Sequence, residues 1–419
     1  MKNILIAIRS IFKKGRHNVM KIVSLGIGLA VGLVLIAKVY FEQSYDDFYP
    51  DRDRVYQVWA KYQQNGGELK DYPQTSGGIA PTMQQQIPEI ETVTRYTSFG
   101  DWTFTMTDTK MKYSGRCIIA DSCFFDILPR PMLIGNAKEV LSTPMYVLVS
   151  SRIAKNIGGD VIGKNFTVDS SPGRTMTIGG VFEEVPENSH SRYDVIVSMA
   201  SAGRFMWEGS PTNMLGNDRY ISYVKLHKGV NPLALEEQVH TFVNSYFPPE
   251  EQQKTGFNIG FSFHELDGLH KELPQVKRMT WILSLLAFAL IFTAVMNYIL
   301  IVISSIVNRS KEVAVHKCYG ASENNIHGMM FGEALVHIVL SLILALLLIL
   351  AFRGTVEELL ATSLDSLLLS NGSLVLLGIC ILVFFVSGFM PGSLYARIPV
   401  ASAFRNYREN KRIWKKALL

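Results

Sequence analysis

Four long apolar runs constrain the fold of this chain more than any other feature of its sequence. They occupy residues 22–41, 280–307, 334–352 and 373–395. An α-helix needs about 20 predominantly apolar residues to cross the hydrocarbon core of a bilayer. Each run is long enough for this, so the pattern predicts a membrane protein with four transmembrane helices.

Apart from Lys38, charged residues lie outside these runs, and their distribution predicts the orientation. The formal net charge is +5, with the positive residues concentrated in residues 1–21 and in the tail 397–419. The loop after the second run is also basic, whereas residues 354–372 contain acidic residues and no Lys or Arg. The positive-inside rule therefore places both termini in the cytoplasm of a bacterial inner membrane, with residues 42–277 in the periplasm. Because the positive charges flank membrane spans, no nucleic-acid partner is expected.

The first apolar run permits two interpretations. Its basic flank also suits a cleaved signal peptide, but the run is long and no A-x-A site follows it, which favours an uncleaved helix. Lys38 lies close enough to the helix end to extend toward the lipid headgroups. The spacing of Gly28 and Gly32 predicts close approach of a second helix.

Three polar residues fall within the other runs or at their margins. We interpret Asn297 as a packing residue that hydrogen-bonds to a neighbouring helix, since an amide in lipid needs a partner. Glu333 and His337 are one helical turn apart and should share a face near the cytoplasmic end. Ionisable groups in a membrane are candidate functional residues, although a structural partnership is the interpretation we favour for Glu333.

The segment between the first two runs has the pattern of an α+β domain. Alternating residues predict strands at 54–59 and 175–181, and helical patterns occur at 79–86 and 232–246. The segment is long enough to bury its own core and has room for two subdomains. We therefore predict four transmembrane α-helices plus a large α+β extracytoplasmic domain inserted between helices 1 and 2.

No motif for catalysis or metal binding occurs in the sequence. The chain has no G-x4-G-K-[ST] phosphate loop, no H-E-x-x-H and no G-x-S-x-G. We therefore expect a non-catalytic subunit without a cofactor or metal of its own. His264, Glu265 and His270 are interpreted as ordinary surface groups.

Two further clusters remain without an assigned chemistry. Asp46, Asp47, Asp51 and Asp53 lack the glycine and final glutamate of a calcium-binding EF-hand loop, so we interpret them as a solvated exit from the first helix. Cys117 and Cys123 leave two alternatives open, a disulfide bridge or two buried thiols.

Several segments are similar to the FtsX-like, MacB-type ABC transporter permease family in the versions found in Bacteroidetes. The resemblance covers nearly the whole chain. It is carried by residues 7–14, 25–30, 44–56, 88–91, 124–126 and 185–190, and by the ending P-x4-A-R-x-x-P-x-x-A at 391–401. The outer segments resemble the family's MacB-like periplasmic core domain.

The most specific resemblance follows the second run, at residues 309–322. The family pattern is approximately R-x-x-E-[IV]-G-[IV]-R-[KR]-A-x-G-A-S. Matching positions are Glu312, Lys317, Gly320, Ala321 and Ser322, whereas Ala314, His316 and Cys318 depart from it. Residues 311–319 can form a short amphipathic helix that ends at Gly320. From the residues alone, this helix suits a membrane-surface anchor as well as a contact with a partner.

The resemblance implies that this helix couples the permease to a separate ATPase. The coupling residues would be Lys311, Glu312, Val313, Val315, His316, Lys317, Gly320, Ala321 and Ser322. ATP and Mg²⁺ would be bound by the ATPase. The permease would act in the membrane, in contact with lipids, as a homodimer or as a heterodimer with a related chain. A periplasmic adaptor is a further partner that the resemblance allows. The implied function is ATP-driven movement of the outer domain, for efflux or periplasmic handling of peptides, antibiotics or lipoproteins.

Two other classes of function stay open at this point. One is a membrane-anchored regulator of a cell-envelope enzyme, and the other is an enzyme with its active site in the outer domain. The expected organisation is: cytoplasmic segment 1–20, helix 21–41, outer domain 42–277, helix 279–307, coupling loop 308–328, helix 330–353, outer loop 354–372, helix 373–396 and basic tail 397–419.

Overall fold

The computed structural model describes residues 18–169, 171–216, 218–304, 315, 318–320, 322–368, 375, 378–379 and 381–383. The chain divides into two compact units. One comprises Met1–Gln43 with Pro274–Leu419, and the other comprises Ser44–Leu273. The long insertion between two apolar helices thus forms a domain of its own, which we call the outer domain.

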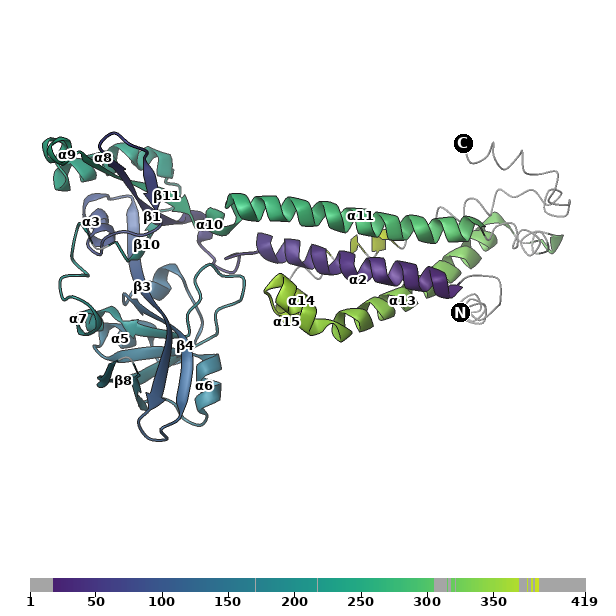
Figure 1. Cartoon of the computed structure of the whole chain (residues 1–419), viewed down its shortest axis with the longest axis horizontal. Coiled ribbons are helices and arrows are strands. Elements are labelled where there is room, and N and C mark those ends of the chain that lie inside the picture. Colours follow the sequence, from purple (N-terminus) through teal and green to yellow (C-terminus); the bar gives the residue numbers. More distant parts are fainter. Residues whose placement is uncertain are drawn as a thin grey trace. The chain divides into compact units, whose positions relative to one another are not determined.

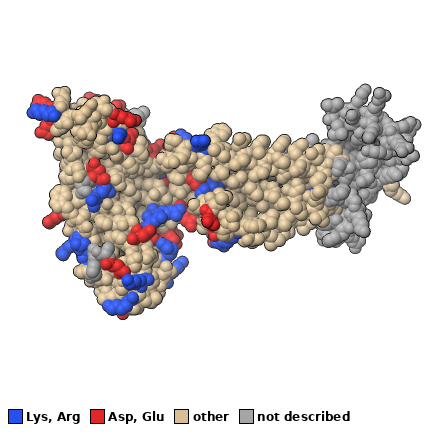
Figure 2. Space-filling model, in the orientation of Figure 1, with Lys and Arg blue, Asp and Glu red and all other residues tan. Residues whose placement is uncertain are grey.

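Three long apolar helices make up most of the described part of the first unit. They are α2 (Asn18–Gln43), α11 (Pro274–Ser304) and α13 (Glu323–Ala351). Each contains a stretch long and apolar enough to cross a membrane. Helix α2 packs against both α11 and α13 (Figure 1). Figure 2 shows that the visible surface along the middle of these helices is almost entirely uncharged, as contact with lipid requires.

The fourth expected helix is not confirmed. Of residues 373–396, the structure describes only 375, 378, 379 and 381–383, so this segment lies largely outside the described residues. The expected outer loop 354–372 contains two short helices, α14 (Arg353–Leu360) and α15 (Leu364–Leu368). Arg353 joins them through ion pairs to Glu357 at 2.9 Å and to Asp365 at 3.0 Å.

The outer domain is built on one mixed, 11-stranded sheet. The main strand order is β11-β1-β10-β3-β4-β9-β6-β8-β5, with β2 paired to β1 and β7 paired to β3 and β8. Most neighbours are antiparallel, but β4 with β9 and β6 with β8 are parallel. The strands are β1 (Val55–Gln64), β2 (Lys70–Tyr72), β3 (Ile90–Met106), β4 (Lys112–Ala120), β5 (Met132–Ile134), β6 (Tyr146–Ser150), β7 (Asn165–Val168), β8 (Ser171–Phe182), β9 (Val195–Ser198), β10 (Ile221–Leu226) and β11 (Phe257–Glu265).

Short helices cover this sheet. They are α3 (Ile79–Gln86), α4 (Phe124–Ile127), α5 (Ala137–Ser142), α6 (Ser151–Ile157), α7 (Ala202–Phe205), α8 (Glu236–Tyr246), α9 (Pro249–Thr255) and α10 (Gly268–Lys271), with 3-10 turns η1 (Arg52–Arg54), η2 (Met199–Ser201) and η3 (Pro232–Leu235). Within the domain, α3, α8 and α9 lie near β1, β10 and β11, whereas α5, α6 and α7 lie near β4 and β8 (Figure 1). One hydrophobic cluster lies under α3 and α8, and two others surround β4, β6 and β9.

The expected elements of this domain are confirmed where they were specified. The alternation at 54–59 falls in β1 except for Arg54, the last residue of η1, and that at 175–181 falls in β8. The helix expected at 79–86 is α3, and the one expected at 232–246 is η3 followed by α8. Cys117 and Cys123 are free thiols, and burial raises the pKa of each, so the alternative of a disulfide bridge is not realised.

Candidate functional site

Glycines bring the membrane helices close together. A Cβ atom added to Gly28 would overlap Ala294 Cβ of α11, and one added to Gly32 would overlap Ile291 Cγ1. At Gly26, an added Cβ would lie 2.9 Å from Leu344 Cδ2 of α13. The missing side chains let α2 pack closely against both neighbours, and the close approach predicted from Gly28 and Gly32 is confirmed.

Lys38 does not extend toward headgroups as the sequence suggested. It is only 7% exposed and forms a 2.6 Å ion pair with Glu42, one turn along α2. Its Nζ also donates to Thr362 Oγ1 at 2.8 Å. Lys38 stays inside the unit because Thr362, in the turn between α14 and α15, accepts a hydrogen bond from its ammonium group.

The three polar residues of the apolar runs occupy different environments. Glu333 and His337 are 7% and 1% exposed and lie one turn apart on α13. His337 Nδ1 is 3.3 Å from the hydroxyl of Tyr298 on α11. Asn297 instead lies on an exposed face of α11, so the predicted contact with a neighbouring helix is not found among the described helices. Successive residues of a helix point in directions about 100° apart, and on α11 Tyr298 points to the buried side while Asn297 points to the exposed side.

The expected coupling segment is described only in part. Lys311, Glu312, Val313, His316, Lys317 and Ala321 lie outside the described residues. Val315 is exposed, and its carbonyl accepts from the backbone N–H of Tyr319 at 3.0 Å. Gly320 has φ +85°, the left-handed conformation of a glycine that ends a helix. Ser322 caps α13 by accepting from the Asn325 backbone N–H.

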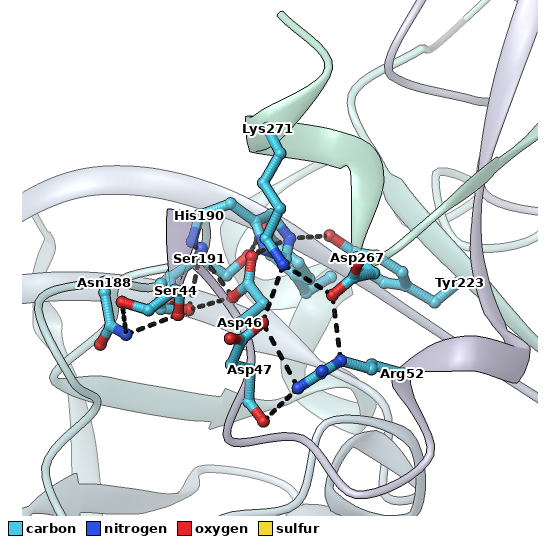
Figure 3. A network of polar contacts seen from close by, with 12 residues as sticks. Ser44, Asp46, Asp47, Arg52, Asn188, His190, Ser191, Tyr223, Asp267 and Lys271 are labelled. Carbon is cyan, nitrogen blue, oxygen red and sulfur yellow. Dashed lines mark hydrogen bonds and ion pairs between the residues drawn. The ribbon is translucent and has the colours of Figure 1, made fainter. Parts of the chain in front are cut away.

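A buried polar network forms where the chain enters the outer domain (Figure 3). At its centre, the Asp46 side chain is 1% exposed. Its carboxylate accepts from Ser189 Oγ at 3.0 Å and from the backbone N–H of His190 at 3.3 Å, and it lies 2.7 Å from His190 Nδ1. Asp46 also adopts φ +60°, which aspartate tolerates better than most residues. These contacts fix an otherwise unfavourable backbone conformation.

The network continues through the imidazole of His190. His190 Nε2 contacts the hydroxyl of Tyr223 and lies 3.3 Å from Ser191 Oγ, which in turn contacts Tyr96. Burial raises the pKa of Tyr96 to about 12 and also raises that of Tyr223, so both hydroxyls keep their protons at neutral pH. A neutral imidazole with its proton on Nδ1 satisfies both neighbours, because Asp46 accepts and Tyr223 donates.

Ser191, His190 and Asp46 share the residue types of a nucleophilic triad, but the arrangement does not present a nucleophile. Ser191 is 3% exposed and its hydroxyl is engaged by Tyr96, while Tyr223 occupies the histidine nitrogen that would act as base. A general base must instead reach the proton that it removes from the nucleophile. The network therefore serves to hold the entry segment against the domain core.

A second set of contacts joins the entry of the domain to its exit. Lys271 is 2.8 Å from Asp47 and 2.9 Å from Asp267, and Arg52 is 3.0 Å from Asp267 and 3.3 Å from Asp47 (Figure 3). We call Asp47, Arg52, Asp267 and Lys271 the entry–exit clasp. The rings of Tyr45 and His270 stack beside it with centroids 3.5 Å apart. Residues that directly follow α2 are thus tied to residues that directly precede α11.

The clasp and network correct in part the interpretation of the acidic cluster as a solvated exit, because Asp53 is exposed as expected but the other three aspartates make side-chain contacts. Asp46 is buried, Asp47 belongs to the clasp, and Asp51 pairs with Lys225 at 2.5 Å and with Arg54 at 3.1 Å. Arg52 and Arg54 are neighbours in the sequence, but Lys225, Lys271 and His190 lie more than 140 residues away, so no local pattern shows these pairings. The described residues contain no group of three or more His, Cys, Asp or Glu side chains placed to hold a metal. His264 is half-buried against Trp59 and is not an ordinary surface group.

Comparisons with known proteins agree with this architecture. Residues 20–242 match the MacB-like periplasmic core domain, and residues 284–400 match the FtsX-like permease C-terminal domain. No curated protein gives a match.

Solved structures that are similar to part of the chain include the following three. One is a domain of a Porphyromonas gingivalis protein described as a permease, with 32% identity and TM-score 0.48, covering 52% of this chain and 91% of that one. Another is the periplasmic region of MacB from Actinobacillus actinomycetemcomitans, with 16% identity and TM-score 0.34, covering 49% and 87%. The third is the extracellular domain of the noncanonic ABC-type transporter YknZ from Gram-positive bacteria, with 10% identity and TM-score 0.35, covering 49% and 98%.

The first family model alone spans more than half of the chain, including α2 and most of the sheet, and the second begins within α11. The chain belongs to the family of ABC transporter permeases that combine a MacB-like periplasmic core domain with an FtsX-like C-terminal domain.

Proposed function

We propose that this chain is the permease subunit in which ATP hydrolysis by a separate ATPase moves the periplasmic domain. The observation that supports this most directly is the entry–exit clasp. Helix α2 ends at Gln43 and the outer domain begins at Ser44, while the domain ends at Leu273 and α11 begins at Pro274. The clasp residues therefore lie within ten residues of the ends of these two helices along the chain.

Two features favour transmission of movement along this path. The glycine contacts pack α2 against α11, so these helices are expected to move together. The clasp ties the segments that continue from them, and the Asp46 network holds the entry segment to the domain core. A transmitted conformational change needs such a contiguous set of packed elements. The ATPase, its ATP and Mg²⁺, and a second permease copy belong to this proposal as partners.

Co-purification tests the partnership. We expect the tagged chain, extracted in mild detergent, to bring down an ATPase of the ABC class and a second permease chain. Reproducible purification of the permease without any ATPase would contradict the proposal. Isolation with an envelope hydrolase in place of the ATPase would instead support a regulatory role.

Gly320 provides a sharper test of coupling. Proline cannot adopt φ +85°, so Gly320→Pro should break the end of the coupling helix and uncouple ATP hydrolysis from outer-domain movement. Gly320→Asn is the matched control, because asparagine tolerates the left-handed conformation. Glu312→Lys should also uncouple while leaving membrane insertion intact. Normal coupling in both Gly320→Pro and Glu312→Lys would remove the role assigned to this segment.

A further inference from the structure

Helices α14 and α15 lie beside the end of α2 that leads into the outer domain (Figure 1). We call residues 353–368, which contain both helices, the bracket. Arg353 joins the two helices through its ion pairs, and Glu357 also accepts from the backbone N–H of Leu364 at 2.8 Å. Leu364 and Leu367 of α15 are buried. The bracket is therefore a folded element with its own polar and apolar contacts.

A buried polar contact fastens the bracket to α2. Lys38 Nζ donates to Thr362 Oγ1 at 2.8 Å, and Thr362 Oγ1 in turn donates to the carbonyl of Leu360 at 3.0 Å. Both Lys38 and Thr362 are buried, and Glu42 lies 2.6 Å from the ammonium group. A buried charge needs paired and hydrogen-bonding groups around it. This contact therefore holds the bracket against the last turns of α2.

The bracket begins where a membrane-crossing helix ends. Ser341 of α13 donates to the carbonyl of Ile22 near the start of α2, and the bracket that follows α13 contacts the end of α2. Helices α2 and α13 are therefore parallel. The apolar stretch of α13 ends at Ala351, and α14 starts at Arg353. Helix α14 thus starts at the surface of the membrane, on the side where α2 leads into the outer domain.

Trp281 marks the same level on the third long helix. Gly28 of α2 faces Ala294 of α11, and Gly32 faces Ile291, so α2 and α11 are antiparallel. Counting on from these contacts at 1.5 Å per residue places Trp281 beside the last turn of α2, close to the level of the bracket. The Trp281 side chain is 79% exposed. Exposed tryptophans are enriched where membrane-crossing helices meet the lipid headgroups.

One face of α14 is apolar and open. Phe352 accepts from the backbone N–H of Val356 and so closes the first turn, and Leu359 follows on the same face one turn after Val356. Phe352 is 60% exposed and Leu359 is 80% exposed. The exposed apolar residues Leu347 and Leu350 precede them at the end of α13. The apolar surface of the membrane-crossing helix therefore continues along the chain into α14.

We propose that α14 is an interfacial helix whose open face, with Phe352 and Leu359, lies among the phospholipids of the adjoining leaflet. A helix with one apolar face can lie in the plane of the membrane at the boundary between headgroups and acyl chains. Through the contact of Lys38 with Thr362, the bracket then holds the end of α2 at the lipid surface, next to the start of the outer domain. The lipid contact requires no ATPase, so this inference does not rest on the proposed function.

Photocrosslinking identifies what covers the open face. The full-length chain, with p-benzoylphenylalanine in place of Leu359, is reconstituted into vesicles of phosphatidylethanolamine and phosphatidylglycerol. We expect irradiation to attach phospholipid at position 359, as measured by mass spectrometry of the peptides. The same amino acid in place of Glu358, on the polar side of α14, is the matched control and should give little lipid adduct.

Three results of the crosslinking experiment would overturn the proposal. The first is a crosslink from position 359 to a second copy of the chain or to residues 373–396 of the same chain. The second is the absence of any lipid adduct at position 359. The third is an equal yield of lipid adduct at positions 358 and 359, which would show that α14 has no preferred face toward lipid.

Thr362 tests the link between the bracket and α2. Thr362→Val keeps the branched shape but removes the acceptor for Lys38. We expect hydrogen exchange at the backbone amides of α15 to become about fivefold faster in the same vesicles, as for the loss of one hydrogen bond. Thr355→Val makes the same change at an exposed position of α14 and should leave this rate unchanged. Equal exchange rates in Thr362→Val and the natural chain would show that the Lys38 contact does not hold the bracket.

Discussion

The helical unit and the outer domain hold their segments together in opposite ways. In the helical unit, α2 and α11 approach because Gly28 and Gly32 have no side chains. In the outer domain, the entry segment is held by side chains that carry charge or strong hydrogen-bonding groups, above all Asp46 and Lys271. Lipid offers no hydrophobic driving force between apolar helices, so close packing is favoured there. The outer domain instead pairs charges at its surface, as at Lys271, and hydrogen-bonds polar groups inside it, as at Asp46.

The largest expected effect lies in the buried network of the outer domain. Asp46→Ala removes the acceptor for Ser189 and His190 and places alanine at a left-handed φ. We expect the free energy of unfolding to fall by about 3 kcal/mol, since the partners stay buried without an acceptor. Denaturant unfolding of the full-length chain would measure this.

Two variants control the Asp46 experiment. Asp46→Asn keeps an oxygen acceptor and tolerates the backbone conformation, so it should lose less stability than Asp46→Ala. Asp53 is exposed in the same segment, and Asp53→Ala should change stability by less than about 0.5 kcal/mol. Similar losses for Asp46→Ala and Asp53→Ala would show that the buried network does not stabilise the entry segment.

The next effect lies in the helical unit. Gly28→Leu introduces a side chain where even a Cβ atom would overlap Ala294. We expect overpacking to destabilise the helical unit by about 2 kcal/mol. Thermal unfolding in detergent would measure this, with Val31→Leu on an exposed face of α2 as the control. An unchanged transition for Gly28→Leu would mean that α2 and α11 do not pack closely in the membrane.

What could be predicted from the sequence depends on whether a feature is set by neighbouring residues or by residues far apart in the chain. Apolar runs and strand alternation are local signals, so α2, β1 and α3 could be located from a few neighbouring residues. Asp46 and His190 are 144 residues apart, and no local pattern shows that two polar residues so distant will meet inside the domain. Asn297 illustrates the converse: its position in a helix was predictable, but which face of α11 its neighbours cover depends on packing between helices.

A smaller effect is expected at the clasp. The side chains of Asp47 and Asp267 are 38% and 36% exposed, so Lys271→Met should cost less than about 1 kcal/mol. Unlike the loss in Gly28→Leu, this loss should shrink as salt is raised, because exposed charges are screened. Lys254→Met on the exposed helix α9 is the matched control. A loss that is independent of salt would show that the lysine stem acts by packing and not through its charge.

The smallest expected effect is on the pH dependence of stability, at Asp51 in the entry segment. Hydrogen bonds from Lys225 and Arg54 lower the pKa of Asp51. A carboxyl whose pKa is lower in the folded state stabilises that state above its unfolded value of about 3.9, and this contribution disappears as the pH falls through the folded pKa. The stability difference between the natural chain and Lys225→Met should therefore be present at pH 6 and shrink below about pH 4. Burial raises the pKa of Asp121, which gives the opposite slope, but this contribution is common to both proteins and cancels in the difference. Stability measured from pH 6 to pH 2 tests this, and a difference that persists at the acid end would assign the role of Lys225 to packing in place of its pairing with Asp51.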